Sequence, residues 1–477
     1  MVAAGAVLKR KEKPPRPPLR LWLSAGALAL SGGFHFGYNL VLTNSAELAF
    51  KDFVNSSIAA SNGEGEDDVS LSTRWSLYVS LLYFGSLVGA FVIRPLADKL
   101  GRKRTVLMCA SGQAIAVCLS IVSFLLHSHI LYAISRFILG FFQSITVGVA
   151  PMYMSESSPP ACRGKISLST GLSVQIAVVL SSILANPQHF GTPSTWWVLY
   201  AVELCVFAVA LVGVSMLPES PSYLITRGDR EGAARSFAFF HGISGLDLDN
   251  AHASKSVGLL GLIRDAAHRG RAFTGAVVMF AVVNGGTVVI TGYAFNIFVT
   301  VGLERNVAGW AIIGMSSLLV VGTGLSSIVV DRFGRRPLLL ITLSALLVLN
   351  CLIAILMYMF EVYKMYIFGN LLIAVMCLHN FVFSAGPSPL SFFIASELCP
   401  HHVRGAAMTC CAVIMAGSRA IILAVYPPLA ARIHSAQTYG LMFIPSTLIC
   451  TLYLYKKFPE TKAPKAVPRK EEEANVE

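Results

Sequence analysis

Charged residues are scarce in this sequence. Asp, Glu, Lys and Arg make up 13% of its 477 residues, 55% are hydrophobic, and the mean hydropathy is +0.66. Soluble globular proteins carry about 25% charged residues, so this chain has too few charges to solvate a surface of its size. The same numbers exclude a disordered chain. Because a membrane-spanning helix needs about 20 apolar residues, the chain has room for roughly ten to fourteen of them.

Motifs of metal-binding and catalytic proteins are missing as well. The ten cysteines form no Cys-x-x-Cys pair, which argues against zinc ligation, and we interpret them as small apolar packing residues. No Walker loop and no nucleophile–base arrangement is evident, so we expect no enzyme, no metal and no cofactor. A cleavable signal peptide is not evident either, because the apolar segment after the basic, Pro-rich tail is longer than a signal-peptide core.

Long apolar runs predict twelve spanning helices, arranged as six and six. They are expected at 21–43, 75–97, 105–127, 129–150, 165–186, 196–217, 271–299, 306–330, 337–360, 365–395, 406–430 and 436–456. The polar stretch between the two groups predicts a small helical linker. The expected organisation is a tail at 1–20, a six-helix bundle at 21–225, the linker at 226–270, a second six-helix bundle at 271–457 and a tail at 458–477.

The net charge of +12 is distributed unevenly among the predicted loops. With the N-terminal tail inside, every basic cluster falls on one side, whereas the outer loop 43–74 is acidic. This positive-inside pattern predicts cytoplasmic termini in a multi-pass membrane protein, with the plasma membrane as the expected location and no nucleic-acid partner. Asn55 begins a glycosylation sequon on the outer loop, and Trp75 and Trp196 are interpreted as part of an interfacial aromatic belt.

Three polar motifs occur twice, in the same order and at nearly the same spacing, close to half the chain length. The run 98–103 recurs at 331–336, Glu156 with Arg163 recurs as Glu397 with Arg404, and 218–220 recurs at 459–461. Duplicated halves around a central cavity are the build of many secondary transporters. The repeat therefore favours a transporter.

Each copy of the run lies in a tight cytoplasmic turn, which its glycine, Gly101 or Gly334, permits. The repeated charges in these turns suit a gate. Ion pairs of this kind can close the inner end of a cavity in one conformation and break in the other. A purely topogenic role for these charges is the alternative. The residues expected in the gate are Asp98, Arg102, Glu156, Arg163, Glu219, Asp331, Arg335, Glu397 and Arg404.

Further motifs lie outside the repeat: Phe36-Gly37-Tyr38-Asn39, Arg136-x3-Gly140, Pro151-Met152-Tyr153 and Gly386-Pro387-Ser388-Pro389. The repeated run at 218–220 extends to Pro221. Together with the repeated motifs they cover nearly the whole chain. As a set they resemble the facilitative glucose (hexose) transporters, in the sugar-porter branch of the major facilitator superfamily. The resemblance implies an all-α membrane protein with twelve transmembrane helices in two six-helix bundles, which moves a small solute by alternating access.

Asn39 bears on energy coupling. In proton-coupled relatives the family pattern has Asp at this position, facing an Arg that matches Arg136. An Asp can titrate and an Asn cannot, so the resemblance implies an uncoupled site at Asn39 and Arg136 and favours uniport. The alternative for Arg136 is that its side chain extends to the outer membrane surface.

The sugar-contacting residues of the family are largely missing. Val282, Val283 and Val288 stand where the family has Gln, Gln and Asn, Gly171 stands where it has Gln, and Phe392 replaces a Trp. Arg419, about four helical turns beyond Arg404, lies deep in the predicted bilayer, where a charge usually faces water, a partner or a ligand. It is expected either to bind an anionic solute or a sugar hydroxyl, or to pair structurally. Glu203 and His379 are weaker candidates, interpreted as structural residues.

The expected function is facilitative uniport of a small solute, with a hexose as the leading candidate. The cavity should lie at the bundle interface near mid-membrane, lined by Asn284, Thr287, Thr291, Tyr293, Asn296, Ser384, Phe392 and Arg419. One alternative is a transporter of a different, anionic solute. Another is a non-transporting sensor, although such sensors carry long cytoplasmic tails and only about 20 residues follow the last predicted span. The expected partners are the small solute and the lipid bilayer.

Overall fold

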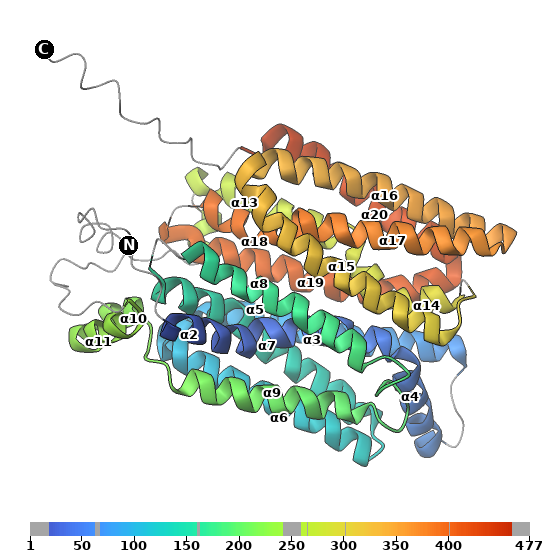
Figure 1. Cartoon of the computed structure of the whole chain (residues 1–477), viewed down its shortest axis with the longest axis horizontal. Helices are drawn as coiled ribbons and strands as arrows, with labels where there is room; N and C mark the ends of the chain where they lie inside the picture. The colour runs from blue at the N-terminus through green and yellow to red at the C-terminus, as the bar shows by residue number, and fades with distance from the viewer. Residues whose placement is uncertain are drawn as a thin grey trace, which may run out of the picture.

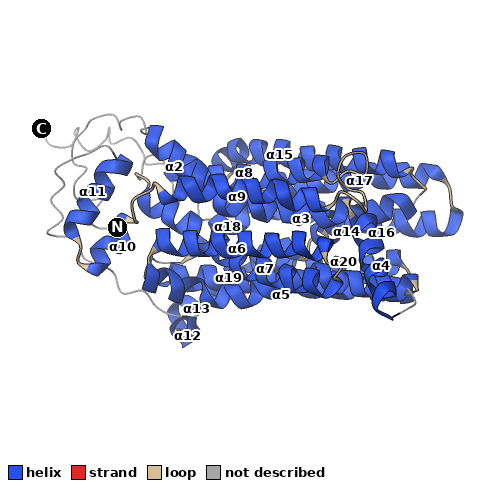
Figure 2. Ribbon diagram, turned by 90° about the horizontal axis from the view of Figure 1, so that it is seen from below, coloured by secondary structure: helices blue, strands red, loops and turns tan. Residues whose placement is uncertain are grey.

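The computed structural model describes residues 19–62, 67–159, 163–241, 259–264, 266–300, 302–399 and 401–459. All regular elements in these ranges are helices (Figure 2). In the first half they are α2 (Leu19–Ala29), η1 (Leu30–Phe34), α3 (His35–Ser45), α4 (Glu47–Asn62), α5 (Asp68–Leu100), α6 (Arg102–Leu125), α7 (His129–Ser157), α8 (Arg163–Leu184) and α9 (Trp197–Ser215).

Three short helices follow, and the second half then repeats the pattern of long ones. The short helices are α10 (Pro221–Arg227), α11 (Arg230–His241) and α12 (Leu259–Arg264). The remaining helices are α13 (Ala266–Val283), α14 (Thr287–Thr300), α15 (Arg305–Phe333), α16 (Arg335–Tyr363), α17 (Tyr366–Ala385), α18 (Pro387–Leu398), α19 (His401–Ile433) and α20 (Ser435–Lys457).

The long helices run side by side along the longest axis of the molecule (Figure 1). Helices of the first half of the chain gather on one side and those of the second half on the other, and α5 and α8 of the first half pack against α19 and α15 of the second. The short helices α10 and α11 lie at one end of this assembly, and α4 lies at the opposite end (Figures 1 and 2).

The described helices account for the twelve predicted spans. Ten segments are long and apolar enough to cross a membrane. The other two are α8 and the continuous helical rod 19–45, in which a single π-helical turn, η1, joins α2 to α3. Many large apolar side chains on these helices are exposed, among them Phe91, Ile115, Val212 and Ile341. Such surfaces are stable when they face lipid, while the backbone polar groups are satisfied within each helix.

Two predicted spans are broken. The prediction at 271–299 becomes α13 and α14, separated by a turn at 284–286, and the prediction at 365–395 becomes α17 and α18, separated at Gly386. Gly286 has a φ of +91°, which an L side chain rarely adopts. Discontinuous helices of this kind border the solute sites of many transporters.

The two copies of the repeated motif share one backbone geometry. Gly101, between α5 and α6, has φ 91° and ψ 170°, and Gly334, between α15 and α16, has φ 90° and ψ 168°. This region of backbone space is essentially restricted to glycine. The glycine turn expected from the sequence is therefore present in both halves, and the repeat extends to the level of backbone angles.

Much of the segment 43–74, which the sequence predicts as an acidic loop between spans, forms helix α4. Its apolar residues recur at helical spacing, and Phe50, Phe53 and Val54 are buried. Phe50 stacks on Trp75 with ring centroids 5.4 Å apart, and it lies 4.9 Å from the ring of Trp196. Both tryptophans are almost fully buried, at 1% and 0% exposure. The belt interpretation was wrong for these two, because α4 covers the helix ends on which they lie.

We predict that Gly101→Ala will destabilise the protein. The alanine would be forced into a glycine-only conformation, at a cost of about 1–3 kcal/mol, and its Cβ would lie 2.5 Å from Oε2 of Glu219. Thermal unfolding in detergent, followed by intrinsic fluorescence, measures the effect. Gly314→Ala is the matched control, because a Cβ at that helical glycine meets nothing within 4 Å. Equal unfolding midpoints for the two variants would contradict the prediction.

Candidate functional site

A small cavity lies between the two halves of the molecule. Its volume is about 10 Å³, room for about one water molecule, so the two halves pack closely around it in this conformation. The walls come from α3, α5 and α7 on one side and from α14 and α19 on the other. The lining residues are Asn39, Leu40, Thr43, Val79, Tyr83, Arg136, Val288, Thr291, Gly292, Arg419 and Leu423.

Arg419 extends from α19 towards the first half of the chain. Its guanidinium carbon lies 5.7 Å from the ring centroid of Phe36 and 5.8 Å from that of Tyr83. Each contact is a cation–π interaction worth about 0.5–2 kcal/mol. Among the described residues, Nε and Nη1 of Arg419 are buried without a hydrogen-bond partner. The aromatic rings thus hold the guanidinium in place but leave donors unused.

The second arginine in the cavity wall has a balanced charge. Nη1 of Arg136 donates to Oδ1 of Asn39 at 3.0 Å, and Nδ2 of Asn39 donates to Oε1 of Glu203 at 2.6 Å. Glu203 on α9 is fully buried. A buried charge is tolerated when it is paired and hydrogen-bonded. Here the Asn39 amide bridges the guanidinium of Arg136 and the carboxylate of Glu203.

His35 completes this buried cluster. Its Nδ1 lies 3.2 Å from the same Oε1 of Glu203, and its ring stacks on Phe207. On the far side of the arginine, the hydroxyls of Tyr132 and Tyr200 are hydrogen-bonded at 3.0 Å. Interpreting Arg136 as extending to the membrane surface is therefore wrong, because its side chain is 1% exposed and ends within the protein.

Next to the cavity, the Asn44 side chain bonds the two halves together. Nδ2 of Asn44 donates to the carbonyl of Thr291 at 2.9 Å, and the N–H of Phe295 donates to Oδ1 of Asn44 at 3.0 Å. Those two backbone groups are four residues apart and would pair with each other in a regular α-helix. The amide of Asn44 thus bonds α3 to the backbone of α14 at both of its polar atoms.

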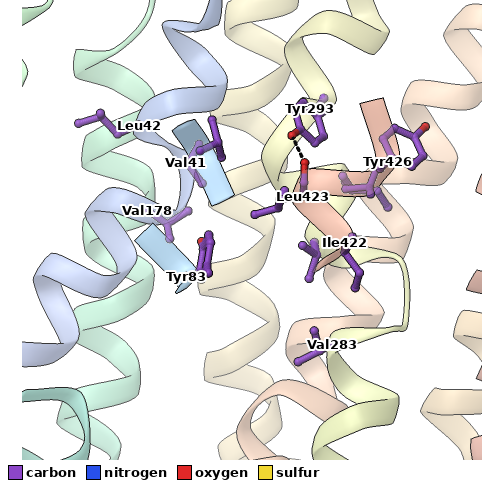
Figure 3. Close-up of a cluster of buried hydrophobic side chains, with 14 of the residues drawn as sticks. Val41, Leu42, Tyr83, Val178, Val283, Tyr293, Ile422, Leu423 and Tyr426 are labelled. Atoms are coloured by element: carbon purple, nitrogen blue, oxygen red, sulfur yellow. Dashed lines mark hydrogen bonds between the residues drawn. The ribbon is translucent and has the colours of Figure 1, made fainter. Parts of the chain in front are cut away.

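Other contacts join the halves nearby. The hydroxyls of Ser182 on α8 and Ser316 on α15 are 2.8 Å apart and buried. Figure 3 shows Tyr83 and Val178 from the first half near Leu423 from the second, and the hydroxyl of Tyr293 donates to the Leu423 carbonyl at 2.8 Å. These residues belong to one buried apolar cluster that spans both halves.

An ion pair between a buried carboxylate and a partly buried lysine lies at the start of α4. Nζ of Lys51 is 2.6 Å from Oε1 of Glu47. Burial raises the pKa of the Glu47 carboxyl above its ordinary value, and the charge of Lys51 opposes that shift. The pair therefore carries a desolvation cost, which its close geometry offsets in part.

The break between α13 and α14 is supported by side chains from two other helices. The carbonyl of Gly285 accepts hydrogen bonds from Nε2 of His379 at 2.9 Å and from Nδ2 of Asn350 at 3.1 Å. The hydroxyl of Tyr439 in turn donates to Oδ1 of Asn350 at 2.8 Å. Backbone groups freed within a membrane need such partners, which gives His379 a structural role.

Of the eight residues expected to line the cavity, Thr291 and Arg419 are in its wall. Tyr293 packs behind it, stacked on Tyr426, and Thr287 is buried nearby. Asn284 sits at the helix break and donates to the Phe280 carbonyl at 3.0 Å.

The other three expected residues lie elsewhere. Ser384 donates to the Phe381 carbonyl at 3.0 Å and packs against Gly322, and Asn296 is exposed. The side chain of Phe392 is outside the described residues.

The predicted cytoplasmic gate is described for its first half only. Arg102 pairs with Glu156, with Nη2 2.9 Å from Oε1, and it lies 3.8 Å from Asp98. Oε1 of Glu219 accepts the backbone N–H groups of Arg102 and Lys103 at 2.9 and 3.0 Å. A carboxylate at a helix N-terminus is favoured by the unpaired N–H groups and the helix dipole. These bonds all lie within the first half and tie α6 to α7 and α10.

In the second half of the predicted gate, Arg335 is the residue whose side chain lies within the described part of the structure. Arg335 is half-buried at the start of α16. The side chains of Arg163, Asp331, Glu397 and Arg404 are outside the described residues.

Sequence reasoning overlooked His35, Asn44 and Tyr83, and it gave Glu203 too little weight. Glu203 carried the strongest signal, because a lone acid in an apolar span needs a partner. The sequence around Asn44 gave no signal of its role, since a polar residue near the end of a predicted span is common. Its partners are backbone groups far away in the sequence.

Comparisons with known proteins agree with this arrangement. Residues 25–466 match the family model described as "Sugar (and other) transporter". Human solute carrier family 2, facilitated glucose transporter member 11, is 28% identical over 407 residues, which cover 83% of this chain and 81% of that protein. Human facilitated glucose transporter member 7 is 28% identical over 477 residues, covering 95% of this chain and 91% of that protein.

Solved structures share the fold. A major facilitator superfamily proton:xylose symporter bound to 6-bromo-6-deoxy-D-glucose aligns with a TM-score of 0.73 at 20% identity, covering 93% of this chain and 97% of that one. The partially occluded, inward-open xylose transporter from E. coli aligns with a TM-score of 0.71 at 19% identity, covering 94% and 100%. The twelve-helix major facilitator fold expected from the sequence is confirmed.

We predict that Asn44→Ala will loosen α14. The change removes both bonds to the α14 backbone, each worth about 1–3 kcal/mol when a buried group is left unpaired. Hydrogen–deuterium exchange of a peptide covering 288–298 should become faster. Ser45→Ala is the control, because the neighbouring Oγ of Ser45 is buried without a hydrogen-bond partner in the described structure. Unchanged exchange in Asn44→Ala would refute the role of Asn44.

We predict that Glu203→Ala will be strongly destabilising, by about 3–5 kcal/mol, because it leaves the buried charge of Arg136 uncompensated. Glu203→Gln should cost less, since it keeps an acceptor for Asn39. The thermal unfolding midpoint in detergent measures both. Glu231→Ala, at an exposed position of α11, controls for loss of a carboxylate. If Glu203→Ala unfolds at the same temperature as Glu231→Ala, the cluster does not balance Arg136.

Proposed function

Because this chain belongs to the sugar transporter family, we propose that it carries a hexose across a membrane as a uniporter, by alternating access. The observation that carries the proposal is the cavity whose wall is shared by both halves of the chain. Relatives named facilitated glucose transporters match most of this chain, and a bound glucose analogue is named in one similar structure. A sensor or an enzyme finds no support in a family of transporters.

In this proposal the two six-helix bundles, at 21–225 and 271–457, move relative to each other around the cavity. The Asn44 bonds to α14 and the Ser182–Ser316 contact close the outer side. Opening outward requires α14 to leave α3. The cytoplasmic charges of the two halves then form the inner closure. The pairs of Arg102 with Glu156 and of Glu219 with α6 keep the first-half part of that closure rigid.

The orientation follows from the loop charges. We propose that the protein lies in the plasma membrane. Helices α10 and α11 and both ends of the chain are then in the cytoplasm, and α4 is on the outer side. Asn55 then lies on the outer face and is available for glycosylation. The sequon hydroxyl, on Ser57, is buried against the His127 carbonyl and the backbone N–H of His129, so a glycan would be attached before α4 packs down.

The uniport part of the proposal rests on Asn39. Its amide joins Arg136 to Glu203 without a titratable group of its own. A similar structure is named a proton:xylose symporter, and Glu203 and His35 are titratable groups close to Asn39. The response of transport to a pH gradient therefore decides between uniport and proton coupling.

We expect purified protein in liposomes to equilibrate D-glucose faster than protein-free liposomes, and to leave L-glucose outside. An imposed pH gradient should change neither the rate nor the final level, in wild type and in Glu203→Gln alike. Uptake of labelled sugar with time gives both quantities. Accumulation above the external concentration that follows the gradient would overturn uniport. A lack of D-glucose uptake at any gradient would overturn the hexose assignment.

A further inference from the structure

The cavity between the two halves carries one unbalanced positive charge. Arg136 is linked through Asn39 to the Glu203 carboxylate, so that pair is neutral as a unit. Arg419 contacts the faces of Phe36 and Tyr83, which attract a cation but do not cancel its charge. None of the described residues that line the cavity is acidic. A solute that brings one negative charge would complete the site.

The unused hydrogen-bonding groups of the wall point to the same chemistry. The buried side-chain atoms of the lining that lack a partner in the described structure are Nε and Nη2 of Arg136 and Nε and Nη1 of Arg419. Guanidinium nitrogens donate and cannot accept. Each hydroxyl of a neutral sugar has a hydrogen to donate as well as lone pairs to offer, and these four nitrogens match only the lone pairs.

Two polar residues of the wall, Asn39 and Thr291, already make hydrogen bonds within the protein. Both polar atoms of the Asn39 side chain are bonded within the Arg136–Glu203 link. The Thr291 hydroxyl donates to the Thr287 carbonyl at 2.8 Å, and the Thr291 carbonyl accepts from Asn44. The carboxylate is a group that only accepts hydrogen bonds, and the planar fork of a guanidinium matches it with two parallel bonds.

We propose that Arg419 recognises the carboxylate of a sugar acid, so that the transported sugars include a hexuronate class. The proposal rests on the proposed function, because it assigns a substrate class to the same cavity. A carboxylate carries one charge and matches the single unbalanced guanidinium. A phosphate monoester brings about −1.5 to −2 charges at pH 7 and would leave the cavity negative.

The test uses three probes of nearly the same shape: D-glucuronate, its uncharged amide D-glucuronamide, and D-glucose. Dissociation constants are measured on purified wild-type protein at pH 7 by isothermal titration calorimetry, and uptake of each probe is measured in liposomes. Because hydrogen bonds to a charged group are the strong ones, we expect D-glucuronate to bind at least about tenfold more tightly than the amide. Equal or weaker binding of D-glucuronate would overturn the inference.

Variants then assign the effect to Arg419. Arg419→Gln should abolish the preference for D-glucuronate over the amide, and Arg419→Lys should keep part of it, because the charge remains but the fork is lost. Arg432→Gln, at an exposed position in the last turn of the same helix, should keep the full preference. A preference that survives Arg419→Gln would overturn the assignment, and the wild-type comparison of acid with amide needs no variant to fold.

The outcomes separate this inference from the proposed function. Uptake of D-glucose without any preference for D-glucuronate overturns the inference and leaves hexose transport standing. Tight binding and uptake of D-glucuronate without D-glucose uptake supports the inference and overturns the hexose assignment. Failure of all three probes to bind or to enter liposomes overturns both.

Discussion

A charge buried within a membrane protein must find its partner inside the protein, and this constraint organises the centre of the molecule. Lipid offers no hydrogen bonds, so each polar group that leaves water needs a specific neighbour. Arg136 reaches Glu203 through Asn39, and that bond links α7 to α3 and α9. Arg419 has aromatic faces instead, both supplied by the other half of the chain. The position of each arginine thus depends on which helices stay packed together.

The same constraint explains how the break between α13 and α14 is stabilised. Ending α13 at Val283 frees the Gly285 carbonyl, which His379 and Asn350 then satisfy from α17 and α16. The next segment, α14, is held on its other side by Asn44 of α3. The break before α14 is therefore anchored within the second half by buried hydrogen bonds, while Asn44 bonds the middle of α14 to the first half, within an apolar cluster that spans both halves.

The spans were predictable because length and hydropathy decide them, and the glycine turns at Gly101 and Gly334 were predictable because the motif repeats. The break at 284–286 was not, since it lies inside an apolar run and depends on a conformation that only the local backbone reveals. Helix α4 was missed because polarity was weighed above the helical spacing of Phe50, Phe53 and Val54. Within the site, a lone Arg419 is visible in an apolar sequence. Asn44 is not, because its partners are backbone atoms of a distant helix.

The two halves share the glycine turn of the motif, with φ and ψ of Gly101 and Gly334 equal to within about two degrees, yet they contribute differently to the cavity. The first half supplies a charge-balanced unit of Asn39, Arg136 and Glu203, and the second supplies Arg419, which among the described residues contacts aromatic faces and no carboxylate. This asymmetry leaves the lining with buried guanidinium nitrogens that have no acceptor among the described residues. Because unpaired buried donors cost free energy, a solute that accepts from these nitrogens would stabilise the conformation that buries them. The charge that is costly to bury without an acceptor therefore also favours the binding of a solute that supplies one.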